Sequence, residues 1–131
     1  MNRIRSLNQI RRFSTTKGVF YETIKVERNE KLGIITLNRP KMYNAVNSTM
    51  YHEIMAGLKE LQEDENISVA AITGEGKFYS SGNDLSSFGK GMASGKSPDE
   101  LSLEAHDMMV AFVDAFIDFD KEIYFKISIS D

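Results

Sequence analysis

The sequence predicts a single α/β domain with a β-hairpin, a crossover helix, a parallel strand and then a long helix. Three observations support this fold class. Two segments that favour strand, Phe20–Arg28 and Gly33–Asn38, flank a polar turn. An amphipathic helical pattern follows, and the short apolar segment Ile67–Thr73 comes directly after it. A strand, a helix and a second strand in this order predict a right-handed crossover between adjacent parallel strands.

The composition is that of an ordinary globular domain. Of the 131 residues, 41% are hydrophobic and 27% are charged, with a net charge of −3. No apolar run approaches the roughly 20 residues that a membrane-spanning helix needs, so we expect no transmembrane segment. The chain has no cysteine, which excludes a disulfide framework and thiolate chemistry. The two histidines, His52 and His106, lie far apart without other ligands at metal spacing, and no metal site is predicted.

The first segment, Met1–Gly18, differs from the rest of the chain. It contains five basic residues and no acid, and its apolar residues Ile4, Leu7, Ile10 and Phe13 recur at helical spacing. This pattern is typical of a mitochondrial transit peptide, and a disordered basic tail is the alternative. Without this segment the chain is strongly acidic, which argues against nucleic-acid binding.

The hairpin is predicted from alternating apolar and polar residues and from the residues that form its turn and end its second strand. Ile24 and Val26 alternate with polar residues in the first segment, as in a half-buried strand. Asn29–Lys31 forms the turn, and Pro40 ends the second strand because proline cannot donate to a strand ladder.

The crossover helix is predicted to start after Asn47 or Ser48, either of which can cap it, and to end at Asp64–Asn66. Its apolar face consists of Met50, Tyr51, Ile54, Leu58 and Leu61. Gly57 lies on this helix and would allow close packing on the sheet.

The segment Gly74–Leu85 follows the apolar run Val69–Ile72 and precedes a short helical pattern, Leu85–Phe88. A turn that leads into a helix directs free backbone N–H groups outward, and the helix dipole adds positive charge there. Such a site stabilises a carbonyl oxygen that gains negative charge. Gly82 permits close backbone approach, and Asp84 is placed to cap the next turn. An ordinary surface loop is the alternative.

The remaining pattern predicts a glycine-rich mobile segment, Gly89–Lys96, and then a long helix. Ser97 and Glu100 form a capping box, with Pro98 at the first helical position. The apolar stripe of this helix serves as core or as a subunit contact, and it comprises Leu101, Ala105, Met108, Met109, Phe112, Phe116 and Phe119.

Two motifs together resemble the enoyl-CoA hydratase/isomerase (crotonase) family. One is Ile34–Lys41 followed by Asn44–Asn47, and the other is Gly74–Leu85 with its Ser-Ser-Gly-Asn-Asp-Leu sequence. The resemblance implies the N-terminal part of a crotonase-like ββα spiral, truncated, over residues 19–119. It ends near Phe119, and residues 120–131 form a divergent tail whose alternating residues could still make a strand.

The family resemblance implies that the substrate is an acyl-CoA thioester and that no other cofactor is needed. The thioester oxygen is held between two backbone N–H groups, one of which matches Asn83, and the enolate formed by loss of a C2 proton is stabilised there. The residues that match the substrate-binding turn are Ser80, Ser81, Gly82, Asn83, Asp84 and Leu85. Lys41 matches a position near CoA, with a solvated loop lysine as the alternative. The second donor and the general base, a glutamate, are expected outside this chain.

The Ser-Ser-Gly-Asn-Asp-Leu variant most resembles the Δ3,Δ2-enoyl-CoA isomerase branch of the family. This implies a homo-oligomeric, trimer-type enzyme of fatty-acid β-oxidation in the mitochondrial matrix, with the peroxisome as the alternative location. The truncated chain is expected to be inactive alone. A non-catalytic isoform or interaction module and an enoyl-CoA hydratase are the competing interpretations.

Overall fold

A four-stranded sheet and three helices make up the described part of the chain, residues 19–127 of the computed structural model. In chain order the elements are β1 (Ile24–Asn29), β2 (Leu32–Leu37), a 3₁₀ helix (Pro40–Met42), α1 (Ser48–Glu63), β3 (Val69–Gly74), α2 (Ser86–Ala93), α3 (Pro98–Ile117) and β4 (Glu122–Phe125). The predicted α/β class is confirmed. The transit-peptide prediction for Met1–Gly18 and the end of the predicted tail, Ser128–Asp131, lie outside the described residues.

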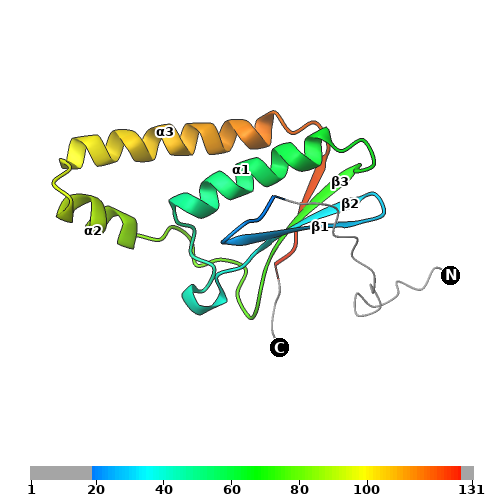
Figure 1. Cartoon of the computed structure of the whole chain (residues 1–131), viewed down its shortest axis with the longest axis horizontal. Coiled ribbons are helices and arrows are strands. Elements are labelled where there is room, and N and C mark those ends of the chain that lie inside the picture. The colour runs from blue at the N-terminus through cyan, green and yellow to red at the C-terminus, as the bar shows by residue number, and fades with distance from the viewer. Residues whose placement is uncertain (1–18, 128–131) are drawn as a thin grey trace.

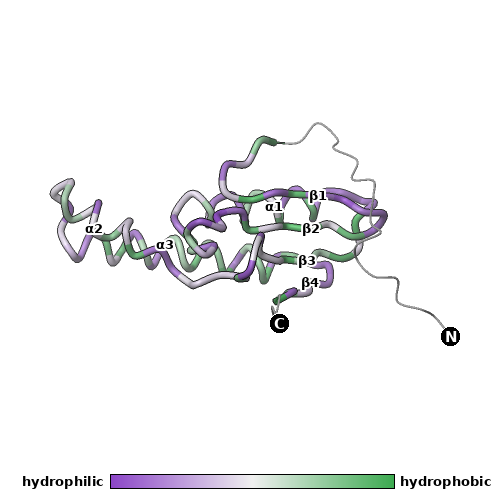
Figure 2. Tube along the Cα trace, turned by 90° about the horizontal axis from the view of Figure 1, so that it is seen from below, coloured by the Kyte–Doolittle hydropathy of each residue, from purple (hydrophilic) through white to green (hydrophobic). Residues whose placement is uncertain are grey.

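The strands lie in the sheet in chain order, β1-β2-β3-β4. β1 and β2 form the predicted antiparallel hairpin, with Val26 opposite Ile35. β3 pairs parallel to β2, as the crossover pattern predicts, and β4 pairs parallel to β3. Helices α1 and α3 run side by side over one face of this sheet, whereas α2 and the first part of α3 project beyond its edge (Figures 1 and 2). The carboxyl ends of β2 and β3 therefore meet at one edge, from which both following loops emerge.

The first strand starts at Ile24, so the predicted start at Phe20 is wrong. The backbone N–H groups of Glu22 and Thr23 donate to the carboxylate of Glu53 on α1, at 2.6 and 2.7 Å. Successive N–H groups of a strand point to opposite sides, so two that bind one carboxylate do not continue a regular strand.

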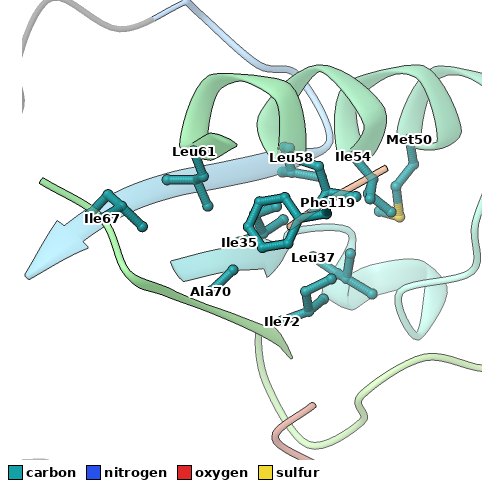
Figure 3. Close-up of a cluster of buried hydrophobic side chains, with 11 residues drawn as sticks. Ile35, Leu37, Met50, Ile54, Leu58, Leu61, Ile67, Ala70, Ile72 and Phe119 are labelled. Atoms are coloured by element: carbon teal, nitrogen blue, oxygen red, sulfur yellow. The ribbon is translucent and has the colours of Figure 1, made fainter. Parts of the chain in front are cut away.

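The core lies between α1 and the sheet, as Figure 3 shows. Asn47 caps α1 by accepting a hydrogen bond from the Met50 N–H at 2.9 Å, which confirms one of the two predicted caps. Below this helix the side chains of β2 and β3 meet its apolar face, and Phe119 from the end of α3 closes the cluster. The buried side chains include Ile35, Leu37, Met50, Ile54, Leu58, Leu61, Ile67, Ala70 and Ile72.

The predicted mobile segment Gly89–Lys96 is wrong, because α2 covers most of it. A Cβ on Gly91 would lie 2.4 Å from Leu101 of α3, so the glycine allows the two helices to approach closely. Helix α2 ends before Gly95, whose φ of +91° suits the reversal into α3. The predicted capping box of Ser97 and Glu100 at the start of α3 is present.

The apolar stripe of α3 is only partly in the core. Leu101 is buried, and Phe112 and Phe116 pack half-buried against the core cluster. Phe119 is also buried, but its predicted place on the helix is wrong, because α3 ends two residues earlier, at Ile117. Other apolar side chains of α3 remain exposed, among them Leu103, Val110, Val113 and Ile117. Among the described residues, no helix is long and apolar enough to span a membrane.

The segment after Phe119 is anchored to the domain. The ammonium group of Lys121 donates to the carbonyls of Leu61 and Asp64 at the end of α1, at 2.7 and 2.8 Å. A cation there also meets the negative end of the helix dipole. The described part of the predicted tail therefore contributes a strand, β4, to the sheet.

Two glycines at the interface between sheet and helix give a matched test of this packing. A Cβ on Gly33 would lie 2.4 Å from the fully buried Leu61, whereas a Cβ on Gly57 would meet its neighbours at 3.2 Å or more. We expect Gly33→Ala to lower the free energy of unfolding by about 1–3 kcal/mol through overpacking. For Gly57→Ala we expect a change below about 1 kcal/mol, because alanine favours helix. Urea denaturation of both variants measures this, and equal losses would contradict the packing.

Candidate functional site

The turn Ser80–Leu85, which follows β3, lies against the loop Arg39–Asn47 between β2 and α1. The Val46 N–H donates to the Gly82 carbonyl at 2.8 Å, and the Asp84 N–H donates to the Val46 carbonyl at 2.9 Å. The Ser81 N–H donates to the carbonyl of Tyr43 at 3.0 Å. The two loops are therefore joined by a short parallel bridge beyond the ends of the strands.

This bridge determines the direction of the Asn83 N–H. Because the peptide between Gly82 and Asn83 is planar and trans, its N–H lies opposite the carbonyl that Val46 binds. No acceptor within residues 19–127 receives this N–H, and Asn83 is exposed. The first N–H of α2, that of Ser86, is instead bound by Asp84 at 3.0 Å. Asn83 therefore contributes a free N–H from the turn itself, three residues before the first residue of α2.

The buried side chain of Asn44 holds the two loops together. Its Oδ1 accepts from the Arg39 N–H at 2.8 Å, within its own loop. Its Nδ2 donates to the carbonyls of Glu75 at 2.9 Å and Phe78 at 2.8 Å, in the loop after β3. All three partners are backbone groups, so this one carboxamide substitutes for a missing strand ladder.

Arg39 and Asp84 form a second connection. Both terminal nitrogens of Arg39 lie 3.1 Å from Asp84 Oδ2, and the carboxylate is only 8% exposed. The hydrogen bond from the Ser86 hydroxyl lowers the pKa of the Asp84 carboxyl most, followed by the hydrogen bond from the Ser86 N–H. The neighbouring Arg39 lowers this pKa further. The carboxylate is therefore ionised at neutral pH. It lies one position before the N-cap residue Leu85, so its cap-like bond to Ser86 comes from just outside α2.

An apolar cleft of about 400 Å³ opens beside Asn83. Its walls come from the start of α1, the turn, α2 and α3. Apolar side chains supply most of the lining, including Leu85, Phe88, Leu101, Met108 and Met109. Lys96 and Glu104 also line it and form an ion pair at 2.6 Å. A cleft of this size and polarity is suited to an apolar ligand that carries a polar group at one end.

Tyr51 links α1 to the turn at this cleft. Its hydroxyl donates to Oδ1 of Asn83, and its ring meets Phe112 of α3 edge-on with centroids 4.8 Å apart. The sequence pattern placed Tyr51 only on the apolar face of the helix. Its polar role was missed, and so was Arg39 as the partner of Asp84, since neither contact leaves a local sequence signal.

A second apolar cavity of about 330 Å³ lies on the other side of Val46. It is lined by residues at the ends of β2, β3 and β4, such as Leu37, Ile72 and Phe125. Tyr79 and the first residue of the turn, Ser80, also line it.

The remaining predicted site residues have differing surroundings. Ser80 Oγ donates to the Asn44 carbonyl at 2.9 Å and accepts from the Gly82 N–H at 3.1 Å, so it supports the turn from within. Gly82 has a φ of +95°, and no described atom would lie within 4 Å of a Cβ there. Ser81 is exposed, and Leu85 reaches the cleft with 78% of its surface exposed. Lys41 is exposed on the 3₁₀ helix and lines neither cavity.

Comparisons with known proteins identify relatives of this chain. The family model for "Enoyl-CoA hydratase/isomerase" matches residues 27–114. Human enoyl-CoA delta isomerase 2 is 37% identical over 120 residues, which cover 92% of this chain and 30% of that protein. A probable enoyl-CoA hydratase of Mycobacterium bovis is 46% identical over 65 residues, covering 50% of this chain and 25% of that protein. This chain therefore spans less than a third of the length of these two relatives.

Solved structures show the same fold. An enoyl-CoA hydratase/isomerase from Xanthobacter autotrophicus Py2 superposes with a TM-score of 0.73 at 25% identity, covering 82% of this chain and 39% of that one. An enoyl-CoA hydratase subunit from Geobacillus kaustophilus superposes with a TM-score of 0.69 at 23% identity, covering 82% and 38%. The described elements thus correspond to part of a larger fold in these structures.

Replacement of Asn44 tests whether its side chain holds the loops. Asn44 has a φ of +53°, so Asn44→Gly keeps the backbone conformation accessible and removes only the side-chain hydrogen bonds. We expect a loss of about 2–4 kcal/mol in the free energy of unfolding, because buried backbone groups lose their partners. The control is Tyr43→Gly, since Tyr43 has a φ of +52° but is exposed. Urea denaturation that gave equal losses for both variants would contradict the role of Asn44.

Proposed function

The chain belongs to the enoyl-CoA hydratase/isomerase family, and from this premise we propose that its turn Ser80–Leu85 binds the thioester of an acyl-CoA. The proposed reaction is that of a Δ3,Δ2-enoyl-CoA isomerase of fatty-acid β-oxidation. In this reaction a proton leaves C2 of a 3-enoyl-CoA, an enolate forms, and a proton returns at C4 to give the 2-trans product. Only protons move, so the proposal requires no cofactor besides the CoA thioester.

The free N–H of Asn83 at the rim of the apolar cleft is the observation that carries this proposal. When C2 loses its proton, the thioester oxygen gains negative charge. A fixed donor aimed at that oxygen stabilises the charge and contributes about 3 kcal/mol to lowering the barrier. The apolar side chains of the cleft would then hold the acyl chain beyond the thioester.

The other residues of the turn support this donor in the proposal. Gly82 adopts the positive φ that precedes Asn83, and Ser80 and Asp84 hold the turn through their hydrogen bonds. Lys41 is proposed to contact the CoA phosphates as a flexible cation. It is exposed and forms no ion pair within the described part of the chain, which leaves its charge available.

None of the acids near the site within residues 19–127 has the surroundings of a general base. Asp84 is held by Arg39 and Ser86, and Glu104 by Lys96. Glu75 pairs with Lys25 at 3.1 Å. We therefore propose that these residues bind and polarise the thioester, whereas a carboxylate outside them removes the proton. The 131-residue chain alone would then bind acyl-CoA without turning it over, as a non-catalytic isoform would.

Hydration of 2-enoyl-CoA is the second candidate reaction. It is supported by the relatives named probable enoyl-CoA hydratases, one of which is the 46% identical protein of M. bovis. The longer match to an isomerase, over 120 residues, favours isomerisation. Both reactions use the same thioester-binding turn, so the proposal for Asn83 does not depend on the choice.

Two further proposals concern the oligomeric state of the protein and its location in the cell. The exposed apolar residues of α3, among them Val110, Val113 and Ile117, support association into a homo-oligomer. We also propose that Met1–Gly18 directs the protein to the mitochondrial matrix, with the peroxisome as the alternative.

The targeting proposal is tested with a fusion of Met1–Gly18 to a fluorescent reporter. We expect the reporter to accumulate in mitochondria, because basic amphipathic segments without acids are imported there. Replacement of Arg3, Arg5, Arg11 and Arg12 by glutamate removes the positive charge and should leave the signal cytosolic. A diffuse signal from the unaltered segment would contradict the proposal.

Binding of decanoyl-CoA and of free CoA to the 131-residue chain tests the thioester site by calorimetry. We expect tighter binding of decanoyl-CoA. Alanine rarely adopts a φ of +95°, so Gly82→Ala should disturb the turn and raise the Kd for decanoyl-CoA by about tenfold. Gly95→Ala is the matched control, because Gly95 has a similar φ of +91° and equally open surroundings but lies outside the cleft lining. Equal effects of the two variants on binding would contradict the site.

The same chain is then incubated with 3-decenoyl-CoA and with 2-decenoyl-CoA. We expect neither isomerisation nor hydration above the uncatalysed rate, since general acid–base catalysis typically supplies a factor of about 10²–10⁴. Isomerisation by this chain would show that one of its own acids is the base, and hydration would favour the second candidate reaction.

A further inference from the structure

The hydroxyl of Tyr51 is a contact that the proposed mechanism does not use. It donates to Oδ1 of Asn83, the residue whose backbone N–H is the proposed oxyanion donor. Tyr51 itself is well placed in α1, because its own N–H donates to the Asn47 carbonyl at 3.0 Å in the first turn of the helix. The side chain of Asn83 is therefore bound to a rigid element, even though the residue lies in an exposed turn.

The backbone next to Asn83 is held by Val46, which belongs to a loop and not to a helix. The preceding carbonyl of Gly82 is held by Val46, but Gly82 has no side chain and its positive φ is one that glycine adopts freely. The N–H of Asn83 receives no restraint, since no acceptor among the described residues binds it. Val46 thus holds the backbone on both sides of Asn83, and the hydrogen bond from Tyr51 to the side chain adds an anchor from a helix.

Tyr51 is also fixed by its neighbours. Its ring lies edge-on to Phe112 of α3, at a centroid distance of 4.8 Å and an angle of 86°. Burial raises the pKa of its hydroxyl, which therefore stays protonated and able to donate at neutral pH. Tyr51 lines the apolar cleft together with Asn83, so it joins α1, α3 and the turn at one wall of that cleft.

We propose that Tyr51 is a positioning residue for the thioester-binding turn. Its hydrogen bond to the Asn83 side chain holds the Gly82–Asn83 peptide, and with it the free N–H, in the direction that a thioester oxygen requires. This inference rests on the proposed function of the turn. It also changes the expected role of the Asn83 side chain: although the donor is a backbone group, loss of the carboxamide releases that donor from α1.

The matched variants are Tyr51→Phe and Tyr43→Phe. The first keeps the aromatic ring against Phe112 and removes only the hydroxyl. The second removes a hydroxyl that has no partner in the described part of the chain, from a ring that also packs edge-on, against Phe78 at 5.2 Å. Asn83→Ala and the double variant with Tyr51→Phe complete a double-mutant cycle.

Two measurements are made on the full 131-residue chain. The backbone ¹⁵N order parameter of Asn83 needs no ligand, and in Tyr51→Phe it should fall from the rigid range near 0.85 towards the flexible range below about 0.6. The Kd for decanoyl-CoA should rise about three- to tenfold, as expected for loss of one hydrogen bond, with the Kd for free CoA unchanged. Asn83→Ala should give a similar rise in Kd, and the double variant should add nothing to it. Tyr43→Phe should match the wild type in both measurements.

An unchanged order parameter of Asn83 in Tyr51→Phe would overturn the inference. A lower order parameter with unchanged affinity for decanoyl-CoA would also overturn it, because the contact would then not serve binding. Additive effects in the double variant would show that the two side chains act separately, and this result would also overturn the inference. If the wild-type chain does not distinguish decanoyl-CoA from CoA, the proposed function fails. The order parameters distinguish that result from a failure of Tyr51 to hold the turn.

Discussion

The buried carboxamide of Asn44 is the constraint on which the candidate site depends. Adjacent parallel strands β2 and β3 place the ends of two separate loops at one edge of the sheet, but strand pairing does not continue far into those loops. Asn44 binds the backbone of both loops, with one acceptor and two donors in use. A buried polar group whose hydrogen bonds are all satisfied adds rigidity, since breaking any of them leaves an unpaired group in a low-dielectric interior.

The direction of the Asn83 N–H follows from that constraint in a few steps. With the two loops in register, Val46 lies opposite Asn83, and the Val46 N–H takes the Gly82 carbonyl. Planarity of the peptide then turns the Asn83 N–H away from the protein. The ion pair of Arg39 and Asp84 joins the same two loops a second time. The donor is therefore oriented before any ligand arrives, which is what makes a backbone N–H effective towards a developing negative charge.

Features that depend on neighbouring residues in the sequence could be predicted. The capping box of Ser97 and Glu100 and the Asn47 cap are local patterns, and each is present in the structure. Features that depend on distant contacts could not. The start of β1 is determined by Glu53 on α1, and α2 extends through glycines because Gly91 meets Leu101 of α3. In both cases tertiary contact overrides the local preference.

The candidate site shows the same division. A turn that leads from a buried strand into a helix indicated free backbone N–H groups, and the structure has one at Asn83. The bridge to Val46 determines the direction of this N–H, and no local sequence pattern reveals that bridge. Tyr51 was identified only as an apolar-face residue, because helical periodicity places a side chain on a face without showing where its hydroxyl points. The proposed roles in thioester binding rest on the family and on the geometry together, since spacing alone does not distinguish this turn from a surface loop.

The two functions proposed for the cleft, holding the carbonyl and holding the acyl chain, are structurally separate. The turn that carries the donor is held by Asn44 and by the ion pair of Arg39 with Asp84, at the carboxyl ends of β2 and β3. Much of the apolar wall comes from α2 and the first turns of α3, which extend past the sheet edge and pack mainly on each other through Gly91 and Leu101. Elements with few buried contacts open at lower free energy than the core. Tyr51 lies where the two regions meet, because it donates to Asn83 of the turn and lines the cleft together with residues of α2 and α3. If the cleft holds an acyl chain as proposed, substitutions in α2 change which chains fit, while the sheet and α1 still determine the orientation of the Asn83 N–H.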